Sequence, residues 1–270
     1  MVLANNESNA RTIRLRDGRQ LGYSEFGEPA GNPIFHFHGY PGSRLEGRIL
    51  HSAAARCNAR FIAVDRPGMG LSDFKRARTI LDWPDDVVEL ADFLHINQFA
   101  VDGASGGGPY SLACAYKIPE RLSHVGVLSG VGPHWDPGEP WMKLNSLIDA
   151  ENFWLKFSEK MPKPDKKAVL NPQVFRLLGE ELFEAFRQGA DGPSYERELY
   201  LRDWGFKLQD ISPTVGVHLW HGELDVNVPI CMGRAVGKAI PNCKTEFYAY
   251  EGHYSTILNH LEEIITFLGS

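Results

Sequence analysis

Cysteine is scarce in this sequence, which has four among 270 residues: Cys57, Cys114, Cys231 and Cys243. No two of them have the C-x-x-C spacing of a metal-binding or redox motif, and two lie in apolar, helix-like stretches. We therefore expect reduced thiols in the protein core. Reduced thiols are typical of the cytoplasm, so a cytoplasmic location is predicted.

Two other features that would point to particular partners are missing. The net charge is −6, from 28 Lys and Arg against 34 Asp and Glu, and the basic residues are scattered. Such a chain has no basic field for nucleic acid or for an anionic membrane. No apolar run approaches the length that spans a bilayer, and residues 1–10 are polar, unlike a secretory signal. We expect a soluble protein without nucleic-acid or membrane partners; its oligomeric state stays open.

The residues that are present favour one α/β domain. Hydrophobic residues make up 43% of the chain, enough for a substantial core. A hairpin with an Asp17-Gly18 turn opens the pattern, helix-length segments such as 82–95 separate the strands, and 258–268 has the period of a closing helix. Apolar runs of strand length occur at residues 33–37, 60–64, 99–101, 125–128, 215–220 and 245–250. This alternation predicts a mostly parallel central sheet flanked by helices.

The strand pattern is interrupted between Pro133 and Pro213. This stretch contains several prolines among amphipathic segments such as 175–187. We predict a core formed by residues 1–132 and 213–270, and a helical cap inserted at 133–212.

A short glycine-rich motif is the first sign of chemistry. Residues 103–107 read Gly-Ala-Ser-Gly-Gly, directly after the apolar run 99–101 and before a helix-like stretch. Glycines two positions before and after a serine are typical of a nucleophile elbow, where a sharp turn lifts the hydroxyl clear of the sheet. Ser105 is therefore a candidate nucleophile for acyl transfer.

A serine nucleophile needs an imidazole base and a carboxylate that orients it. Asp225 and His253 each follow a predicted strand, so both should lie at the same sheet edge as Ser105. Asp136, just beyond the 125–128 strand, is the alternative acid. The order Ser, Asp, His along the chain is the order of an α/β-hydrolase triad.

With these motifs, the chain resembles the α/β-hydrolase family nearly from end to end. The matching segments are His38-Gly39-Tyr40-Pro41-Gly42, the run Asp65 to Ser72, the elbow, the run His221 to Pro229, and Glu251-Gly252-His253. The resemblance implies an oxyanion hole made by the backbone amides of Gly106 and Tyr40. It also implies that Asp65 and Ser72 shape a turn. Asp102 has no assigned role.

The predicted cap is rich in bulky side chains, most of which should form its own core. A cap above the elbow would present some of them to the cleft as an apolar pocket. Our candidates for substrate contacts are Trp135, Trp141 and Trp154. No metal or other cofactor is expected, because His36 and His38 lack a third ligand nearby.

The function predicted from these features is a serine hydrolase of the carboxylesterase type, acting on small to medium, apolar esters. An aspartate in place of Ser105 would be needed for the related epoxide hydrolases and dehalogenases. An aminopeptidase resembling the proline iminopeptidases is the alternative, and it would need cap carboxylates for the substrate ammonium. We expect Glu180, Glu181 and Glu184 to lie on a solvated helix face instead. A C–C bond hydrolase or perhydrolase on the same triad, and a non-catalytic ligand receptor, also remain open.

Overall fold

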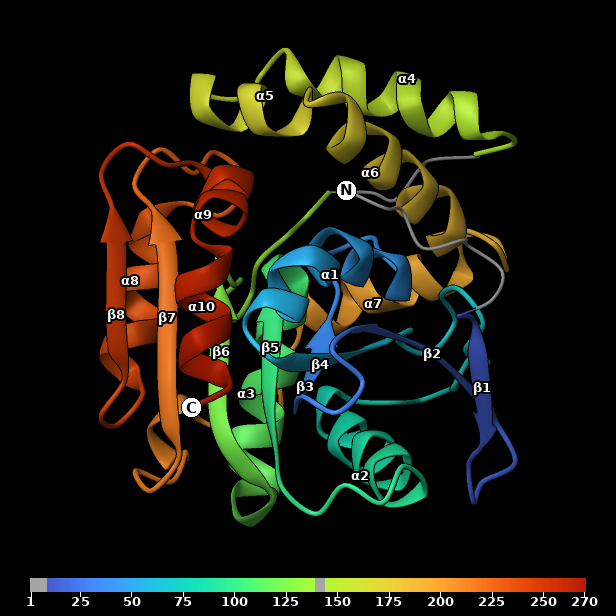
Figure 1. Cartoon of the computed structure of the whole chain (residues 1–270), viewed down its shortest axis with the longest axis vertical. Helices are drawn as coiled ribbons and strands as arrows, with labels where there is room; N and C mark the ends of the chain where they lie inside the picture. Colours follow the sequence, from blue (N-terminus) through green and yellow to red (C-terminus); the bar gives the residue numbers. More distant parts are fainter. Residues whose placement is uncertain (1–8, 139–143) are drawn as a thin grey trace.

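A twisted eight-stranded sheet forms the centre of the computed structural model, which describes residues 9–138 and 144–270 (Figure 1). The order of the strands across the sheet is β1-β2-β4-β3-β5-β6-β7-β8. Their bounds are β1 Arg11–Arg14, β2 Gln20–Gly27, β3 Asn32–Phe37, β4 Ala59–Val64, β5 Phe99–Ala104, β6 Leu122–Leu128, β7 Gly216–Gly222 and β8 Lys244–Tyr248.

The sheet is antiparallel at one end and parallel elsewhere. β1 pairs antiparallel with β2, and β2 pairs antiparallel with β4. From β4 to β8 every neighbouring pair is parallel. The central strands are almost fully buried, as expected for apolar strands covered on both faces. The loops that follow β3, β5, β7 and β8 therefore meet at one edge of the sheet.

Helices cover both faces of this sheet (Figure 1). One face packs against α1 and α10, and the other against α2, α3 and α8. The bounds of the α-helices are α1 Gly47–Arg56, α2 Trp83–Phe93, α3 Gly108–Lys117, α4 Leu147–Ser158, α5 Lys163–Val169, α6 Pro172–Ala185, α7 Asp191–Leu201, α8 Ile230–Ala239, α9 His253–Asn259 and α10 Leu261–Leu268. Short 3-10 helices are η1 Arg44–Glu46, η2 Ile80–Asp82, η3 Ser105–Gly107, η4 Pro119–Arg121 and η5 Leu208–Asp210.

The helices between β6 and β7 do not all pack alike. Helices α4, α5 and α6 lie above the carboxyl ends of the strands and share a hydrophobic cluster of their own (Figure 1). Leu199 and Tyr200 of α7 belong instead to the large cluster of the sheet and α3. The predicted insertion at 133–212 thus contains a separate layer and a helix that packs into the main core. The domain boundaries themselves stay a prediction.

Three details differ from the sequence-based expectations. β8 ends at Tyr248, two residues early, because the chain turns there toward residue 253. The closing helix is interrupted at His260, which leaves α9 and α10 as separate helices. All four cysteines are free thiols, but only Cys114 is buried, and Cys231 on α8 is exposed. The expectation of core thiols is therefore wrong for Cys231. Among the helices of residues 9–138 and 144–270, none is both long and apolar enough to cross a bilayer.

Candidate active site

Ser105 occupies a sharp turn between β5 and α3. Its φ angle is +51°, in the left-handed region that non-glycine residues rarely adopt. The turn brings the chain so close to itself that a Cβ at Gly103 would lie 2.2 Å from the carbonyl oxygen of Gly107. Pro109 follows in the first turn of α3, where a missing N–H costs nothing. The backbone thus has the strained geometry of a nucleophile elbow.

His253 and Asp225 meet at the same edge of the sheet, as the sequence predicts. Nδ1 of His253 lies 2.7 Å from Oδ2 of Asp225, and both side chains are buried. Oδ1 of Asp225 accepts hydrogen bonds from the backbone N–H groups of Asn227 and Val228, each at 2.8 Å. These bonds fix the carboxylate, which in turn fixes the plane of the imidazole.

The pair shifts the pKa of each partner toward the charged form. Burial alone would lower the pKa of His253, but the Asp225 carboxylate outweighs it and raises that pKa above 6.5. Burial alone would raise the pKa of Asp225, but the charge of His253 and the contacts of both His221 and His253 lower it below 3.8. Asp225 is therefore ionised at neutral pH. Because Asp225 engages Nδ1 of His253, Nε2 is the ring nitrogen that remains for a proton-transfer partner.

Asp136, the alternative acid, lies elsewhere. Its carboxylate is exposed and pairs with Arg197 of α7, with Nε–Oδ1 at 2.9 Å. That bond lowers the pKa of Asp136, and within residues 9–138 and 144–270 its carboxylate contacts Arg197 and the N–H of Gly138 rather than a histidine. The geometry therefore favours Asp225 as the partner of His253.

The peptide between Gly39 and Tyr40, which carries the Tyr40 N–H, is held through its carbonyl group. The carbonyl of Gly39 accepts from Nη2 of Arg66 at 2.9 Å and lies 2.8 Å from Nδ1 of His38. In a planar trans peptide the N–H points away from the preceding carbonyl. Arg66 and His38 thereby turn the N–H of Tyr40 away from themselves.

The Gly106 amide is fixed in the same way. The carbonyl of Ser105 accepts from the backbone N–H of Val131 at 3.2 Å and from that of Gly108. The N–H of Gly106 therefore points in the opposite direction. The two amides named as oxyanion donors are thus each oriented by a bond to the carbonyl of their own peptide.

A buried ionic network joins these loops to α7. Arg66 and Glu196 are both fully buried, with Nη2–Oε1 at 2.6 Å, and Arg78 binds the other oxygen of Glu196 at 2.9 Å. Tyr200 lies 2.6 Å from Oε1 of Glu196 and 2.9 Å from the carbonyl of Gly106. Helix α7 therefore braces both the elbow and the loop that carries Tyr40.

Another residue of the predicted insertion anchors the histidine. Asp165 of α5 is buried and accepts the backbone N–H groups of His253, Tyr254 and Ser255 at 2.8, 3.0 and 2.8 Å. These are the first three residues of α9, so the carboxylate satisfies donors that the helix itself cannot. It places the backbone of His253 relative to the layer above it.

The three candidate tryptophans have different surroundings. Trp135 is half-buried, and its ring packs edge-on against Tyr40 and Tyr200, with centroids 6.4 and 5.7 Å apart. Trp154 is buried in the α4–α6 cluster, where its indole N–H donates to the carbonyl of Leu178 and its ring contacts Tyr254. Trp141 lies outside the described residues.

The expectation for the three cap glutamates is wrong. Glu181 and Glu184 are buried rather than solvated. Glu181 accepts the backbone N–H of Ser43, Glu184 pairs with Arg44 at 2.6 Å, and Glu180 pairs with Arg48. The contacted residues belong to the loop and helices after β3. Sequence periodicity could not reveal this face, because it packs against charged partners rather than apolar ones.

His36 and His38 do not approach a common third ligand. His36 pairs with Asp102, with Nδ1–Oδ1 at 3.0 Å, which gives Asp102 a partner that the sequence did not reveal. Within the described residues no group of three or more His, Cys, Asp or Glu is arranged to hold a metal ion. Asp65 and Ser72 do shape a turn: Asp65 accepts the N–H of Leu71, and the hydroxyl of Ser72 donates to the carbonyl of Asp65.

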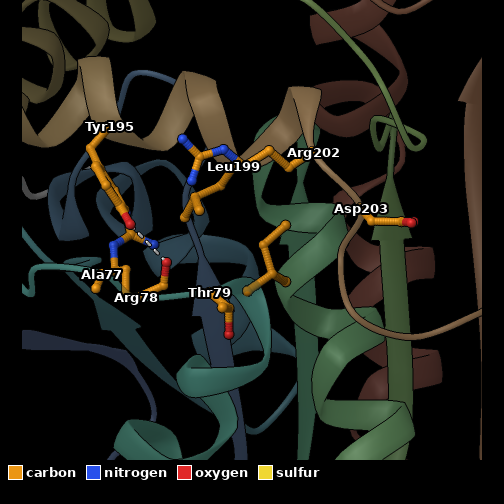
Figure 2. Close-up of a pocket in the computed structure, with 8 residues that line it drawn as sticks. Ala77, Arg78, Thr79, Tyr195, Leu199, Arg202 and Asp203 are labelled. Atoms are coloured by element: carbon orange, nitrogen blue, oxygen red, sulfur yellow. Dashed lines mark hydrogen bonds between the residues drawn. The ribbon is translucent and has the colours of Figure 1, made fainter.

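A hollow of about 270 Å³ lies beside α7 (Figure 2). The Tyr195 hydroxyl donates to the backbone carbonyl of Arg78 across it. The residues that line it are Ala77, Arg78, Thr79, Ile80, Tyr195, Leu199, Arg202 and Asp203. None of these is Ser105, Asp225 or His253, so the hollow is distinct from the candidate active site.

Sequence reasoning missed the residues that support the site: Arg66, Asp165, Glu196 and Tyr200. Apart from the contact between Tyr200 and Glu196 within α7, their partners lie far along the chain, up to 130 residues for Arg66 and Glu196. Of these four residues, only Arg66 could have been found from the sequence, because it lies in the segment Asp65 to Ser72 that resembles the family pattern.

Comparisons with known proteins agree on the fold and differ in activity. The chain is 33% identical over 233 residues to the dihydrolipoyllysine-residue acetyltransferase component of an acetoin cleaving system from Pseudomonas putida, covering 80% of this chain and 58% of that protein. It is 28% identical over 129 residues to the proline iminopeptidase of Neisseria gonorrhoeae, covering 44% and 39%. The structure of the esterase RhEst1 from Rhodococcus sp. ECU1013 matches with a TM-score of 0.72 at 19% identity, covering 97% and 100%. The chain thus spans less than two thirds of these two curated relatives.

A family match covers most of the chain. Residues 32–200 match the alpha/beta hydrolase fold family, a span that begins at β3 and ends within α7. This span includes the Tyr40 loop and the Ser105 elbow, and the sheet order and the strand-end positions of Asp225 and His253 fit the same fold. The chain belongs to the alpha/beta hydrolase fold family.

Proposed function

We propose that this protein is a serine hydrolase that cleaves carboxylic esters of small to medium, apolar substrates through an acyl-enzyme. The observation that carries the proposal is the 2.7 Å bond between His253 and Asp225 at the sheet edge where Ser105 stands on a strained elbow. A cytoplasmic location stays the expectation drawn from the composition.

The proposed mechanism assigns one role to each group. Ser105 Oγ attacks the ester carbonyl while Nε2 of His253 takes its proton. Asp225 stabilises the imidazolium. The amides of Gly106 and Tyr40 stabilise the oxyanion; removing one such donor typically costs about 3 kcal/mol of barrier. His253 then protonates the leaving alcohol, and a water activated by the same imidazole releases the acid.

The surroundings of the site support an uncharged substrate. An aminopeptidase would need a cap carboxylate for the substrate ammonium, and Glu180, Glu181 and Glu184 already bind groups of the loop and helices after β3. From the sequence we expected these glutamates to be solvated, whereas in the structure they are bound to other groups of the protein. In both cases they are not available to bind a substrate ammonium, so we still favour esters. Trp135, edge-on to Tyr40, is the described tryptophan best placed for an apolar substrate group.

The test combines covalent labelling with turnover. A fluorophosphonate probe should label Ser105, as mapped by mass spectrometry, and nitrophenyl esters of short and long acyl chains should turn over. Ser105→Ala should lose labelling and lower kcat by about 10⁴-fold or more. Proline and leucine anilides run in parallel measure the aminopeptidase alternative.

Each outcome separates the candidate functions. Ester hydrolysis that survives in Ser105→Ala would overturn the nucleophile assignment. Cleavage of anilides without esters would replace the ester proposal with the aminopeptidase. Labelling without turnover of either class would leave a C–C bond hydrolase, a perhydrolase or a ligand receptor in its place.

A further inference from the structure

A buried histidine lies between two carboxylates behind the loop that carries Tyr40. Nδ1 of His36 is 3.0 and 3.2 Å from the two carboxylate oxygens of Asp102. Its Nε2 is 3.5 Å from Oε1 of Glu46, an ion-pair distance longer than a hydrogen bond. His36 and Asp102 are each 1% exposed. This row of side chains crosses from β5 through β3 to η1.

The charges in this row balance in part. Burial alone would lower the pKa of His36, but Asp102 and Glu46 outweigh it and raise the pKa to about 10. His36 is therefore an imidazolium at neutral pH. It stands between two carboxylates and compensates part of their negative charge.

Glu46 extends the row to the candidate oxyanion loop. Its Oε2 accepts the backbone N–H of Gly39 at 2.6 Å, a short distance typical of a charge-assisted bond. The carbonyl at the other end of that peptide, on His38, accepts from Nη1 of Arg66. The peptide that precedes Gly39 is thus held at both ends, immediately before the peptide that carries the Tyr40 N–H.

Glu46 also lies close to the nucleophile. A Cβ built on Gly39 would be 3.6 Å from Oε2 of Glu46 and 3.7 Å from Cβ of Ser105. The charge of Glu46 contributes to the raised pKa of His253 on α9 and to that of Glu181 on α6. The carboxylate is therefore within electrostatic reach of the catalytic imidazole.

We propose that Glu46 is a positioning residue of the oxyanion hole, held in place by the His36–Asp102 pair and acting through the Gly39 amide on the orientation of the Tyr40 N–H. The proposal rests on the proposed function, in which Ser105 is the nucleophile and Tyr40 a donor. Among the described residues, the groups in contact with Glu46 or within its electrostatic reach are His36 on β3, the Gly39 amide, Glu181 on α6, and His253 and Tyr254 on α9.

The experiment compares Glu46→Ala, which removes the acceptor, with Glu46→Gln, whose amide oxygen can still accept from Gly39. Glu25→Ala is the matched control: Glu25 is also a half-buried, ion-paired glutamate, but it lies on β2 and pairs with Arg11 and Arg60. Its exposed side-chain fraction is 14%, against 19% for Glu46.

Kinetics give the first readout. Glu46→Ala should lower kcat for nitrophenyl esters about 10- to 100-fold with KM within about 3-fold of wild type, because the loss falls on transition-state contacts. Glu46→Gln should recover most of kcat. Its acid limb of kcat/KM should shift to lower pH, because a charge that raises the pKa of His253 is gone. The rate of fluorophosphonate labelling at Ser105 should follow kcat.

Backbone exchange gives a readout that does not depend on activity. Hydrogen exchange measured by mass spectrometry over residues 38–42 should be faster in Glu46→Ala than in wild type, and unchanged in Glu25→Ala. Exchange that is equal in Glu46→Ala and wild type would overturn the proposal whatever the activity.

The remaining outcomes are equally decisive. A kcat unchanged in Glu46→Ala would also overturn the proposal, as would Glu46→Gln that loses as much kcat as Glu46→Ala without a shift of the acid limb. A wild-type protein that labels but hydrolyses no ester would refute the ester proposal alone. In that case the labelling rates of the variants still decide the role of Glu46.

Discussion

At the scale of single residues, the proposed mechanism makes the proton on His253 the factor that sets the fraction of active protein. Because Asp225 raises the pKa of His253 above 6.5, the acid limb of kcat/KM should have its midpoint above pH 6.5. Asp225→Asn should move this midpoint to lower pH and reduce kcat by about 10³–10⁴-fold, because the imidazole loses its charged partner and its preferred tautomer. Both are measured with a nitrophenyl ester between pH 5 and 9.

The exposed pair Asp136–Arg197 supplies the control for this prediction. Asp136→Asn removes the other acid that sequence reasoning considered, and its ion pair lies on the surface. Its pH profile should match wild type. A wild-type rate that is flat from pH 5 to 9 would contradict the role of His253 as base.

The candidate site was predictable where chemistry follows chain order. Ser105, Asp225 and His253 each stand after an apolar strand, so their meeting at one edge follows from a parallel sheet. Asp165 and Glu46 were not predictable in the same way. Their bonds go to backbone amides of other segments, and a single sequence carries no sign of which amide a carboxylate will reach.

At the scale of elements, α5 and α9 are joined by one carboxylate. Asp165→Ala should remove three hydrogen bonds at the start of α9, lower the free energy of unfolding by about 1–3 kcal/mol, and lower kcat as His253 loses its anchor. Chemical denaturation and ester kinetics measure the two effects. Asp165→Asn, which keeps an acceptor oxygen without the charge, should lie between Ala and wild type.

Glu159, exposed beyond the end of α4, is the comparison residue for Asp165 in the same layer. Glu159→Ala should change neither stability nor kcat measurably, because it carries no such bonds to α9. If Asp165→Ala behaved like Glu159→Ala, the link between α5 and the histidine would have no functional weight.

Element boundaries were less predictable than element types. The strand at 215–220 and the helix at 175–187 were found within a few residues, because their apolar periods are strong. The prediction of a single closing helix was wrong. A break at His260 leaves the apolar period of 258–268 intact, so periodicity alone could not reveal it.

At the scale of the whole molecule, pH acts on stability through buried carboxyl groups whose pKa values are shifted in opposite directions. Burial, with the charge of Glu46, raises the pKa of Glu181 well above 4.5. A folded-state pKa that is raised contributes stability that is present below the unfolded pKa and is lost as pH rises through the folded value. Glu181→Gln can still accept from Ser43 and carries no charge. The stability of Glu181→Gln relative to wild type, measured as the difference in free energy of unfolding, should therefore be greater at pH 8 than at pH 5.

Chemical denaturation at the two pH values measures this difference. Glu196 and Asp225, whose pKa values are lowered, lose their stabilising contribution as pH falls, but both proteins retain them and the comparison cancels their effect. A Glu181→Gln variant whose disadvantage grows between pH 5 and pH 8 would contradict the prediction.

The contacts of the insertion have a consequence for how such a protein can diversify or be engineered. Asp165 of α5, in the layer above the strand ends, and Glu196 and Tyr200 of α7, which packs into the main core, all come from the stretch between β6 and β7. They hold the histidine, the elbow and the Tyr40 loop. Replacing this stretch by that of another family member would introduce a new pocket and, at the same time, remove these supporting contacts. Substrate range should therefore change more readily by point substitutions in the predicted insertion than by exchange of the whole segment. The segment is accordingly a poor unit for recombination.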